Sequence, residues 1–321
     1  MTTGTIRVEE ENHVRRVLID RPNKANALTA AMMHAVAVAV RSGSHADIIL
    51  VQGQSKRGFS AGADIAEFLQ GGEHLKRQEE GLKDIVSAFV GSPRPIIAAI
   101  HGRTLGAGVL LAALCDLVIA ADNLTFGLPE IRFNMYPVIV HAVIDEKISP
   151  ALAFQLCATG RLLSATEGRT LGLVSDVVPE TNFESEMAGR VEFYQDHAAA
   201  LTIGRRVARE TKPSKVNERI AQLAPLMHEN FRQPGVHAKI TGYFAGQMER
   251  ACDAVALQPP PPRKRSSSYY CRRHAILLQP LPADRIQEEA AVPDSIRLRK
   301  QWPRLPSRRC GQVRVSERRP S

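Results

Sequence analysis

Several sequence features that mark common classes of site or cellular compartment are absent from this chain of 321 residues. Its five cysteines are widely spaced and form no CxxC pair, a pattern that suits reduced thiols better than disulfides or a zinc site. No apolar run reaches the ~18 residues of a transmembrane helix, and the polar, acidic residues 1–11 do not resemble a secretory signal. A glycine-rich phosphate loop, a G-x-S-x-G elbow and a metal-spaced His/Glu cluster are also missing. We therefore predict a cytoplasmic protein without a metal or a resident cofactor.

Excess positive charge is confined to the C-terminal fifth of the sequence. The whole chain has a formal net charge of +9. Residues 258–321 contain 15 Lys and Arg against 5 Asp and Glu, a net of +10, which leaves residues 1–257 at −1. Binding to nucleic acid or to a membrane surface, which a basic composition can suggest, therefore concerns the tail and not the body.

The tail, residues 258–321, also differs from the body in composition. It starts with four consecutive prolines (Pro259–Pro262), holds 10 of the 20 prolines and shows no sustained apolar period. Such a composition predicts a disordered Pro/Arg-rich segment. One alternative is a basic extension that binds phosphates in a salt-dependent way, which we favour less. Another is the translation of a GC-rich gene in a wrong reading frame.

Short buried strands alternate with helices through the first half of the body. The runs Asp47–Gly53, Pro95–Ile100 and Cys115–Asp122 are rich in β-branched or small apolar residues. Such runs are typical of strands that are buried on both faces of a parallel sheet. Their alternation with helical segments predicts an α/β fold.

Polar capping residues indicate where two helices begin. Thr29 can cap the helix that follows it, and Asp64 can cap a helix that follows a glycine-containing loop. Further along, the pattern over residues 183–255 is mainly helical. We therefore divide the body into a core domain, residues 1–182, and a helical C-terminal region, residues 183–257, that covers the active site or forms oligomer contacts.

Two glycine-containing turns place free backbone amides ahead of helices. In GFSAGADIAE (Gly58–Glu67) the amide of Ala63 points outward from a sharp turn, and in LGAG (Leu105–Gly108) the amide of Ala107 lies at the positive end of an apolar helix. Two such amides that converge form an oxyanion hole, which stabilises a carbonyl oxygen as it becomes an enolate. Either turn taken alone is also a common way to start a helix.

A third turn, FGLPE, ends at Glu130. The flanking residues are apolar, and burial among them would raise the pKa of the carboxyl group and suit it to proton transfer near neutral pH. From local sequence alone, a capping or surface role explains Glu130 better. His101, His141, Tyr136 and Asn134 lie near the same segments, and for each we favour a structural role over a catalytic one.

Taken together and in order, these segments resemble the enoyl-CoA hydratase/isomerase family, also called the crotonase superfamily. The resemblance is carried by RPNKANAL (Arg21–Leu28), FSAGADIAEF (Phe59–Phe68), PIIAAIHGRTLGAG (95–108), CDLVIAADNLTFGLPE (115–130) and ATGRLLSATEGRTLGLVSDVVP (Ala158–Pro179). It covers about residues 6–179 and fades over the helical region. It implies an α/β, crotonase-like (ClpP/crotonase) fold of repeated ββα units with C-terminal helices, assembled as a homotrimer or a dimer of trimers.

The resemblance also implies that the chain binds acyl-CoA thioesters and polarises the thioester carbonyl with two backbone amides, those of Ala63 and Ala107. Family members more often have glycine at the second position, but alanine still supplies an N–H group. No cofactor is implied, because coenzyme A is part of the substrate. The implied substrate-binding residues, of which the first two lie near the CoA nucleotide, are Ala25, Ala27, Ala61, Asp64, Ile65, Ala66 and Leu110.

The acid–base residues implied by the resemblance favour an isomerase. Hydratases of the family activate water with two glutamates, and this chain has Leu110 at the first position and Glu130 at the second. A leucine cannot hold water, whereas a single carboxylate can move a proton from the α-carbon of a 3-enoyl thioester to its γ-carbon. Val138 stands where dienoyl-CoA isomerases have an aspartate. We therefore predict Δ3,Δ2-enoyl-CoA isomerisation; a hydratase and a non-catalytic CoA-ester-binding homologue are the alternatives.

Overall fold

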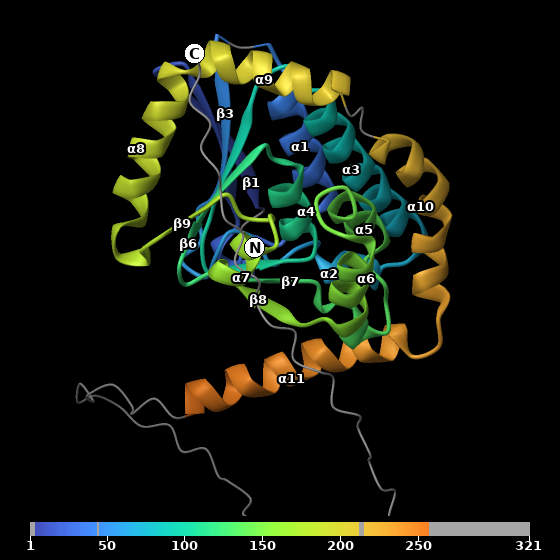
Figure 1. The fold of residues 1–321 in the computed structure, drawn as a ribbon. Coiled ribbons are helices and arrows are strands. Elements are labelled where there is room, and N and C mark those ends of the chain that lie inside the picture. The colour runs from blue at the N-terminus through green and yellow to red at the C-terminus, as the bar shows by residue number, and fades with distance from the viewer. Residues whose placement is uncertain (1–3, 44, 212–214, 257–321) are drawn as a thin grey trace, which may run out of the picture. The chain divides into compact units, whose positions relative to one another are not determined.

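A six-stranded sheet forms the framework of the part of the chain that the computed structural model describes, residues 4–43, 45–211 and 215–256 (Figure 1). The strands, in their order across the sheet, are β1 (Thr5–Glu11), β2 (Val14–Asp20), β3 (Ile48–Gly53), β4 (Ile96–Ile100), β6 (Leu117–Ala121) and β9 (Asp176–Val178). β1 and β2 form an antiparallel hairpin, and the other neighbours are parallel. The α/β class expected from the alternation of strands and helices is therefore confirmed.

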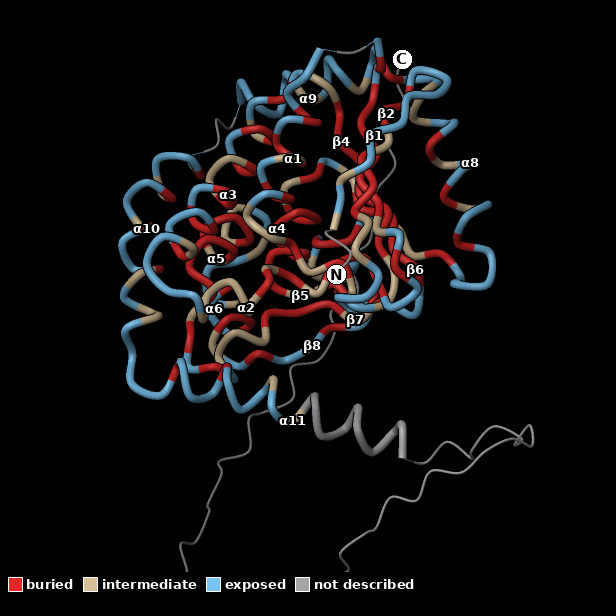
Figure 2. Tube along the Cα trace, turned by 180° about the vertical axis from the view of Figure 1, so that it is seen from behind, coloured by how far each residue is buried: buried red, intermediate tan, exposed pale blue. Residues whose placement is uncertain are grey.

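Helices cover both faces of this sheet. They are α1 (Ala30–Arg41), α3 (Gly72–Gly91) and α4 (Ala107–Leu114) on one face and α8 (Phe183–Asp196) on the other. Successive residues of a strand point to opposite faces, so Val51 of β3 belongs to the core with α1, α3 and α4, whereas Leu50 packs with α8 residues. β3, β4 and β6 are accordingly buried almost throughout (Figure 2).

A second, three-stranded sheet positions the loops that carry the site. It contains β5 (Arg103–Leu105), β7 (Thr125–Gly127) and β8 (Leu162–Ser164), with β5 parallel and β8 antiparallel to the central β7. The ends of β5 and β7 are held together because the Gly106 N–H donates to the Gly127 carbonyl at 3.1 Å. The segments that follow, α4 after β5 and the 3₁₀ helix η2 (Pro129–Phe133) after β7, therefore start side by side.

Two helices begin at the predicted capping residues. The Thr29 hydroxyl accepts a hydrogen bond from the Met32 N–H at 3.2 Å, and α1 starts at the next residue. The Asp64 carboxylate accepts one from the Ala66 N–H at 3.0 Å, at the start of the short helix α2 (Ile65–Phe68). Each side chain supplies an acceptor to an amide that has no partner within its own helix. Both predicted helix starts are confirmed.

The C-terminal part of the described chain is helical. After α5 (Val138–Ile144), α6 (Pro150–Thr159) and α7 (Ala165–Thr170), the chain continues from α8 into α9 (Ala198–Thr211), α10 (Val216–Arg232) and α11 (Val236–Ala256). α10 packs across α3 and α5, and its residues Val216, Ile220 and Met227 join the same core as the large sheet. The predicted disordered tail, residues 258–321, lies outside the described residues. No helix among those that are described is long and apolar enough to cross a membrane.

Candidate active site

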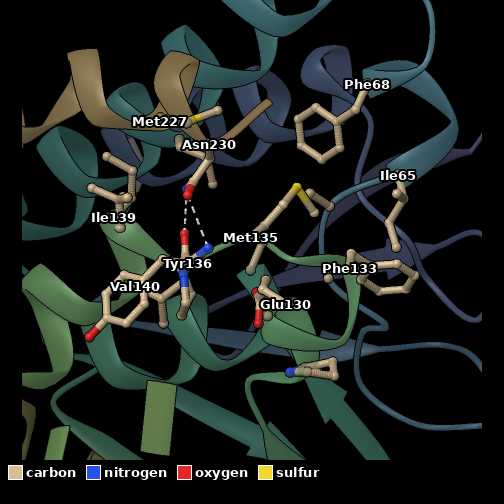
Figure 3. Close-up of a pocket in the computed structure, with 18 of the residues that line it drawn as sticks. Ile65, Phe68, Glu130, Phe133, Met135, Tyr136, Ile139, Val140, Met227 and Asn230 are labelled. Carbon is tan, nitrogen blue, oxygen red and sulfur yellow. Dashed lines mark hydrogen bonds between the residues drawn. The ribbon is translucent and has the colours of Figure 1, made fainter. Parts of the chain in front are cut away.

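A cavity of about 110 Å³ lies between the loops that precede α2 and α4, the turn η2 and the helices α3, α5 and α10 (Figure 3). Ala61, Ala63, Ile65, Ala107 and Glu130 all contribute to its lining. Segments that are far apart in the sequence, the two glycine turns and the FGLPE turn, therefore meet around one space. The groups of this lining that could take part in chemistry include the backbone amides of Ala63 and Ala107 and the carboxyl group of Glu130.

The first amide belongs to Ala63, in the loop before α2. Ala63 forms a parallel bridge with Leu28, in which the Leu28 N–H donates to the Gly62 carbonyl and the Asp64 N–H donates to the Leu28 carbonyl, both at 2.8 Å. In such a bridge the intervening residue turns its own N–H to the opposite side of the chain. The Ala63 N–H therefore points away from Leu28, and Ala63 itself lines the cavity.

Two buried polar side chains hold this loop in shape. The Ser60 hydroxyl donates to the Asn26 carbonyl at 2.8 Å and accepts from the Gly62 N–H at 3.2 Å. The Asn26 carboxamide donates to the Phe59 carbonyl at 3.1 Å and accepts from the Arg21 N–H at 2.8 Å. These bonds satisfy polar groups that would be costly to bury alone, and they fix the residue immediately before Ala63.

The second amide belongs to Ala107, the first residue of α4. The first intrahelical hydrogen bond of α4 joins the Leu110 N–H to the Gly106 carbonyl at 3.1 Å, so the Ala107 amide has no partner within the helix. A Cβ atom on Gly62 would lie 3.3 Å from the Ala107 nitrogen and 2.8 Å from the Leu105 carbonyl oxygen. Because Gly62 has no side chain, and a φ of +97° that glycine tolerates, the two turns approach closely.

The carboxyl group belongs to Glu130, in the first turn of η2. Its Oε1 atom would be 2.7 Å from a Cβ atom on Gly106, which places the carboxyl group next to the Ala107 turn. The Oε2 atom is buried and has no hydrogen-bond partner, although the residue as a whole remains partly open to the cavity. Burial raises the pKa of Glu130 to about 7 and outweighs a hydrogen bond from its own backbone, which lowers the pKa.

The remaining wall of the cavity is apolar. In Figure 3, Met135 lies above Glu130, with Ile139 to one side and Phe68 and Ile65 to the other. The side chains that sequence reasoning missed come from α2, α3, α5, α10 and the loop after η2, and they include Phe68, Leu82, Met135, Ile139, Val140, Met227 and Phe231. Their spacing in the sequence is that of ordinary core positions, so no local signal marks them as parts of a site.

One polar side chain interrupts this wall. The Asn230 carboxamide, on α10, forms two hydrogen bonds with the backbone of Tyr136, accepting from its N–H at 3.1 Å and donating to its carbonyl at 2.6 Å (Figure 3). Asn230 was not among the residues predicted from the sequence, because the resemblance to a known family fades before α10. The only local signal is an asparagine in an amphipathic helix, and in the structure this residue is half-buried.

Several residues implied by the resemblance lie beside the cavity rather than in its lining. Asp64 caps α2 and forms an ion pair with Arg21 at 2.6 Å, so both of its oxygens are engaged. Ala66 supplies the amide that Asp64 caps. The Ala25 carbonyl accepts from the Ala61 N–H at 2.9 Å, and the Ala27 carbonyl accepts from the Arg21 guanidinium at 3.0 Å. These contacts stabilise the loop that contains Ala63.

Leu110 lies in the hydrophobic core and does not line the cavity. Its side chain is completely buried among the residues that α4 shares with the large sheet. The position that would hold the first glutamate of a hydratase is therefore occupied by a packed apolar group. Within the described lining of the cavity, Glu130 is the only carboxyl group.

The weaker candidates mostly have partners of their own. A ring nitrogen of His101, Nε2, lies 3.0 Å from the Ser55 carbonyl, outside the cavity lining. The Tyr136 hydroxyl and the His141 Nδ1 atom are 2.6 Å apart. The Asn134 carboxamide is exposed and donates to the Pro234 carbonyl at 3.3 Å. No group of three or more His, Cys, Asp or Glu in the described ranges could hold a metal ion.

The chain is similar to known proteins of one family. The family model for enoyl-CoA hydratase/isomerase matches residues 9–244. The chain is 31% identical over 221 residues to a human enoyl-CoA delta isomerase 2, which covers 66% of this chain and 56% of that protein, so the match spans about half of the relative's length. It is 32% identical over 239 residues to a probable enoyl-CoA hydratase of Mycobacterium bovis, covering 72% of this chain and 91% of the relative.

Solved structures support the fold. The crystal structure of an enoyl-CoA hydratase from Mycobacterium avium subsp. paratuberculosis superimposes with a TM-score of 0.65 at 23% identity, covering 75% of this chain and 95% of the other. The crotonase-like fold expected from the sequence is thereby confirmed. With a family model that matches most of the body and the fold in agreement, the chain belongs to the enoyl-CoA hydratase/isomerase (crotonase) superfamily.

Proposed function

We propose that this protein is a Δ3,Δ2-enoyl-CoA isomerase in which Glu130 alone carries the proton. The observation that supports this most directly is the composition of the cavity: one buried carboxyl group beside two outward backbone amides, with a packed leucine, Leu110, in place of a second carboxylate. The substrate is a 3-enoyl thioester of coenzyme A. No resident cofactor takes part.

The proposed reaction has two proton transfers through one group. The Glu130 carboxylate removes a proton from the α-carbon of the 3-enoyl thioester, and the electron pair of that C–H bond moves toward the thioester carbonyl. The resulting dienolate oxygen accepts hydrogen bonds from the Ala63 and Ala107 amides. The Glu130 carboxyl group then returns the proton to the γ-carbon, the double bond moves between the α- and β-carbons, and the carboxylate is regenerated. Atoms and charge balance without another reactant.

The surroundings of Glu130 suit this task. A base works best when its pKa lies near the working pH, and burial raises the pKa of Glu130 to about 7. The apolar wall formed by residues such as Met135 and Ile139 excludes water from the carboxyl group and accommodates a hydrocarbon chain. Ala25 and Ala27, at the edge of the first turn, stay our proposed neighbours of the CoA nucleotide.

A substrate panel tests the proposal. Purified protein is assayed with 3-enoyl-CoA and 2-enoyl-CoA thioesters of several chain lengths, together with the Glu130→Gln variant. We expect conversion of 3-enoyl to 2-enoyl thioesters that the variant loses. Hydration of crotonyl-CoA at a rate comparable to the isomerisation, unchanged in Glu130→Gln, would refute the mechanism.

Hydration is the second candidate, since relatives of this chain carry hydratase names. It needs a water molecule held by two groups, and Glu130 is the sole carboxyl group in the described lining. A third candidate is a non-catalytic CoA-ester-binding homologue. Tight binding of a thioester without exchange of its α-protons in heavy water would identify that case, whereas exchange without isomerisation would point to a different acyl-CoA reaction.

The proposed assembly is a homotrimer or a dimer of trimers. Exposed apolar side chains on α8 and α9, namely Phe193, Ile203 and Val207, support it, since α9 leaves one of its faces without an intramolecular partner in the described chain. Light scattering after size-exclusion chromatography measures the mass directly. A monomer at micromolar concentration would refute this part of the proposal.

A further inference from the structure

The contact between Asn230 and Tyr136 joins two regions that are far apart in the sequence. A primary carboxamide matches a peptide group in shape, and here it pairs with both the N–H and the carbonyl of one residue, at 3.1 and 2.6 Å. Tyr136 lies in the loop that connects η2 to α5, and that loop is one wall of the cavity. Asn230 therefore fixes the backbone of this wall from α10.

The same loop is hydrogen-bonded directly to Glu130. The Met135 N–H donates to the Glu130 carbonyl at 3.2 Å, and Asn134, between η2 and Met135, takes a left-handed conformation with φ of +64°. Two consecutive backbone amides thus hold the loop. The Met135 N–H closes the turn that carries Glu130, and the Tyr136 N–H binds the Asn230 side chain. A shift of Tyr136 is transmitted to Glu130 through a single residue.

We propose that Asn230 is a positioning residue, which holds the loop of residues 134–136 so that Met135 covers Glu130 and the carboxyl group stays beside the Ala107 turn. The inference rests on the proposed function of Glu130. It adds a residue from the divergent C-terminal helices, which neither the motifs nor the family resemblance assigned to the site.

Packing on the other side of the loop supports the same role. Phe133 and Met135 form a small apolar cluster with Val236 and Ile240 of α11, and Phe231, the neighbour of Asn230, packs against it. These contacts carry no directional preference of their own, because apolar contacts tolerate sliding. The two hydrogen bonds of Asn230 are directional, and they fix the position of the Tyr136 backbone. Without them the Tyr136 N–H and carbonyl would need water as a partner, and this water would enter the cavity that Glu130 also lines.

The groups around Glu130 leave burial as the main influence on its ionisation. From α6, the buried Cys157 thiol has its pKa raised to about 12, and from the loop the pKa of the Tyr136 hydroxyl is also raised by burial. Burial lowers the pKa of His141 on α5. All three are uncharged near pH 7. Beyond them, Asp145 and Arg219 neutralise each other in an ion pair at 3.0 Å.

The test compares pH profiles of kcat/KM for the wild type, Asn230→Ala and Asn230→Asp. For Asn230→Ala we expect kcat to fall about tenfold or more with a smaller change in KM, and the acid limb of the profile to move to lower pH, because water that enters beside Glu130 stabilises its charged form. Asn230→Asp keeps an acceptor for the Tyr136 N–H but adds a negative charge near Glu130. We expect its acid limb to move to higher pH. A general loss of stability would not shift the two variants in opposite directions.

His228→Ala is the matched control. His228 lies two residues before Asn230 on α10 and pairs with Glu79 of α3, so its removal loosens the same helix without touching the loop of residues 134–136. We expect an unshifted acid limb. If Asn230→Ala keeps the wild-type kcat and acid limb, or if His228→Ala reproduces its shift, the assignment of Asn230 is wrong.

An infrared titration separates this inference from the proposed function. The protonated carboxyl band that disappears in Glu130→Gln reports the ionisation of Glu130 without any turnover. If the wild type shows no isomerisation, the proposed function fails. The inference on Asn230 is then decided by whether that band titrates at lower pH in Asn230→Ala and at higher pH in Asn230→Asp than in the wild type.

Discussion

Gly106 and Glu130 stand so close that a methyl group on the glycine would clash with the carboxyl group: its Cβ would lie 2.7 Å from Oε1 of Glu130. Gly106 also has a φ of +50°, in the left-handed region that side chains rarely adopt. The same residue is the N-cap of α4, whose first amide is that of Ala107. Glycine at this position thus allows the carboxyl group and the second amide to share one small space.

Gly106→Ala should therefore push the Glu130 carboxyl group away from the backbone amides of Ala63 and Ala107. We expect kcat for isomerisation to fall about 100-fold, since small misplacements of reacting groups have effects of that order, together with some loss of stability from backbone strain. Gly172→Ala is the control, because Gly172 also has a positive φ, +80°, but nothing lies within 4 Å of its would-be Cβ. It should lose stability and keep kcat. Equal activities of the two variants would contradict the proposed geometry.

Glu130→Gln should stop proton transfer and leave substrate binding in place. The amide keeps the size of the side chain but cannot accept a proton, and loss of a general base typically costs about 10²–10⁴-fold in rate. We expect α-proton exchange of a saturated acyl-CoA in heavy water, followed by NMR, to slow by about that factor, while the dissociation constant of the thioester changes little. Exchange at the wild-type rate would show that another group is the base.

The pH dependence of the reaction should follow the ionisation of Glu130. The base must be deprotonated to accept the α-proton, so kcat/KM, which reports the free enzyme, should rise with pH and level off above the pKa of about 7. A profile that is flat from pH 5 to pH 8 would mean that the carboxyl group is solvated and not buried. The measurement needs a substrate that is stable over this range, with the rate corrected for thioester hydrolysis.

Much of this site follows from the order of short motifs along the sequence. The capping residues Thr29 and Asp64 and the buried strands are local features, and local hydrogen bonding and hydrophobicity decide them. The strands of the second sheet, by contrast, have three residues each. Such short strands carry too little periodicity to be predicted. They are stabilised by pairing with neighbouring strands and not by a preference of their own sequence.

The residues that complete the cavity were beyond sequence reasoning for a different physical reason. Leu82, Met227 and Phe231 sit on amphipathic helices, where any apolar stripe predicts burial but not whether it faces a core or an open space. Asn230 depends on the placement of α10 against a loop almost a hundred residues earlier, with a sequence separation of 94. The fold of the chain alone brings these groups to Glu130.

The raised pKa of Glu130 also predicts a dependence of stability on pH. The folded-state pKa of about 7 exceeds the ordinary value of 4.5, so the folded protein binds this proton more tightly than the unfolded chain. The resulting contribution to stability is fully present below pH 4.5 and is lost as pH rises through 7. Glu130→Gln lacks this dependence. Its melting temperature relative to the wild type should therefore increase between pH 5 and pH 8, and a constant difference would contradict the burial of the carboxyl group.

Leu110→Glu tests whether a hydratase can be restored by replacing one residue. Leu110 is completely buried in the core and does not line the cavity. A carboxylate there would be buried without a partner, so we expect a loss of about 4 kcal/mol or more in the free energy of unfolding and no hydration of crotonyl-CoA. Urea unfolding and the hydration assay measure the two effects.

Leu110→Met is the matched control for that substitution, because the two side chains have similar volumes and such swaps usually cost less than about 1.5 kcal/mol. It should retain both the fold and the proposed isomerase activity. A Leu110→Glu protein that folds with near-wild-type stability and hydrates crotonyl-CoA would show that the new carboxylate reaches the cavity. In that case the packing of Leu110 would not be what separates this chain from a hydratase, and the single-carboxylate mechanism would lose its structural basis.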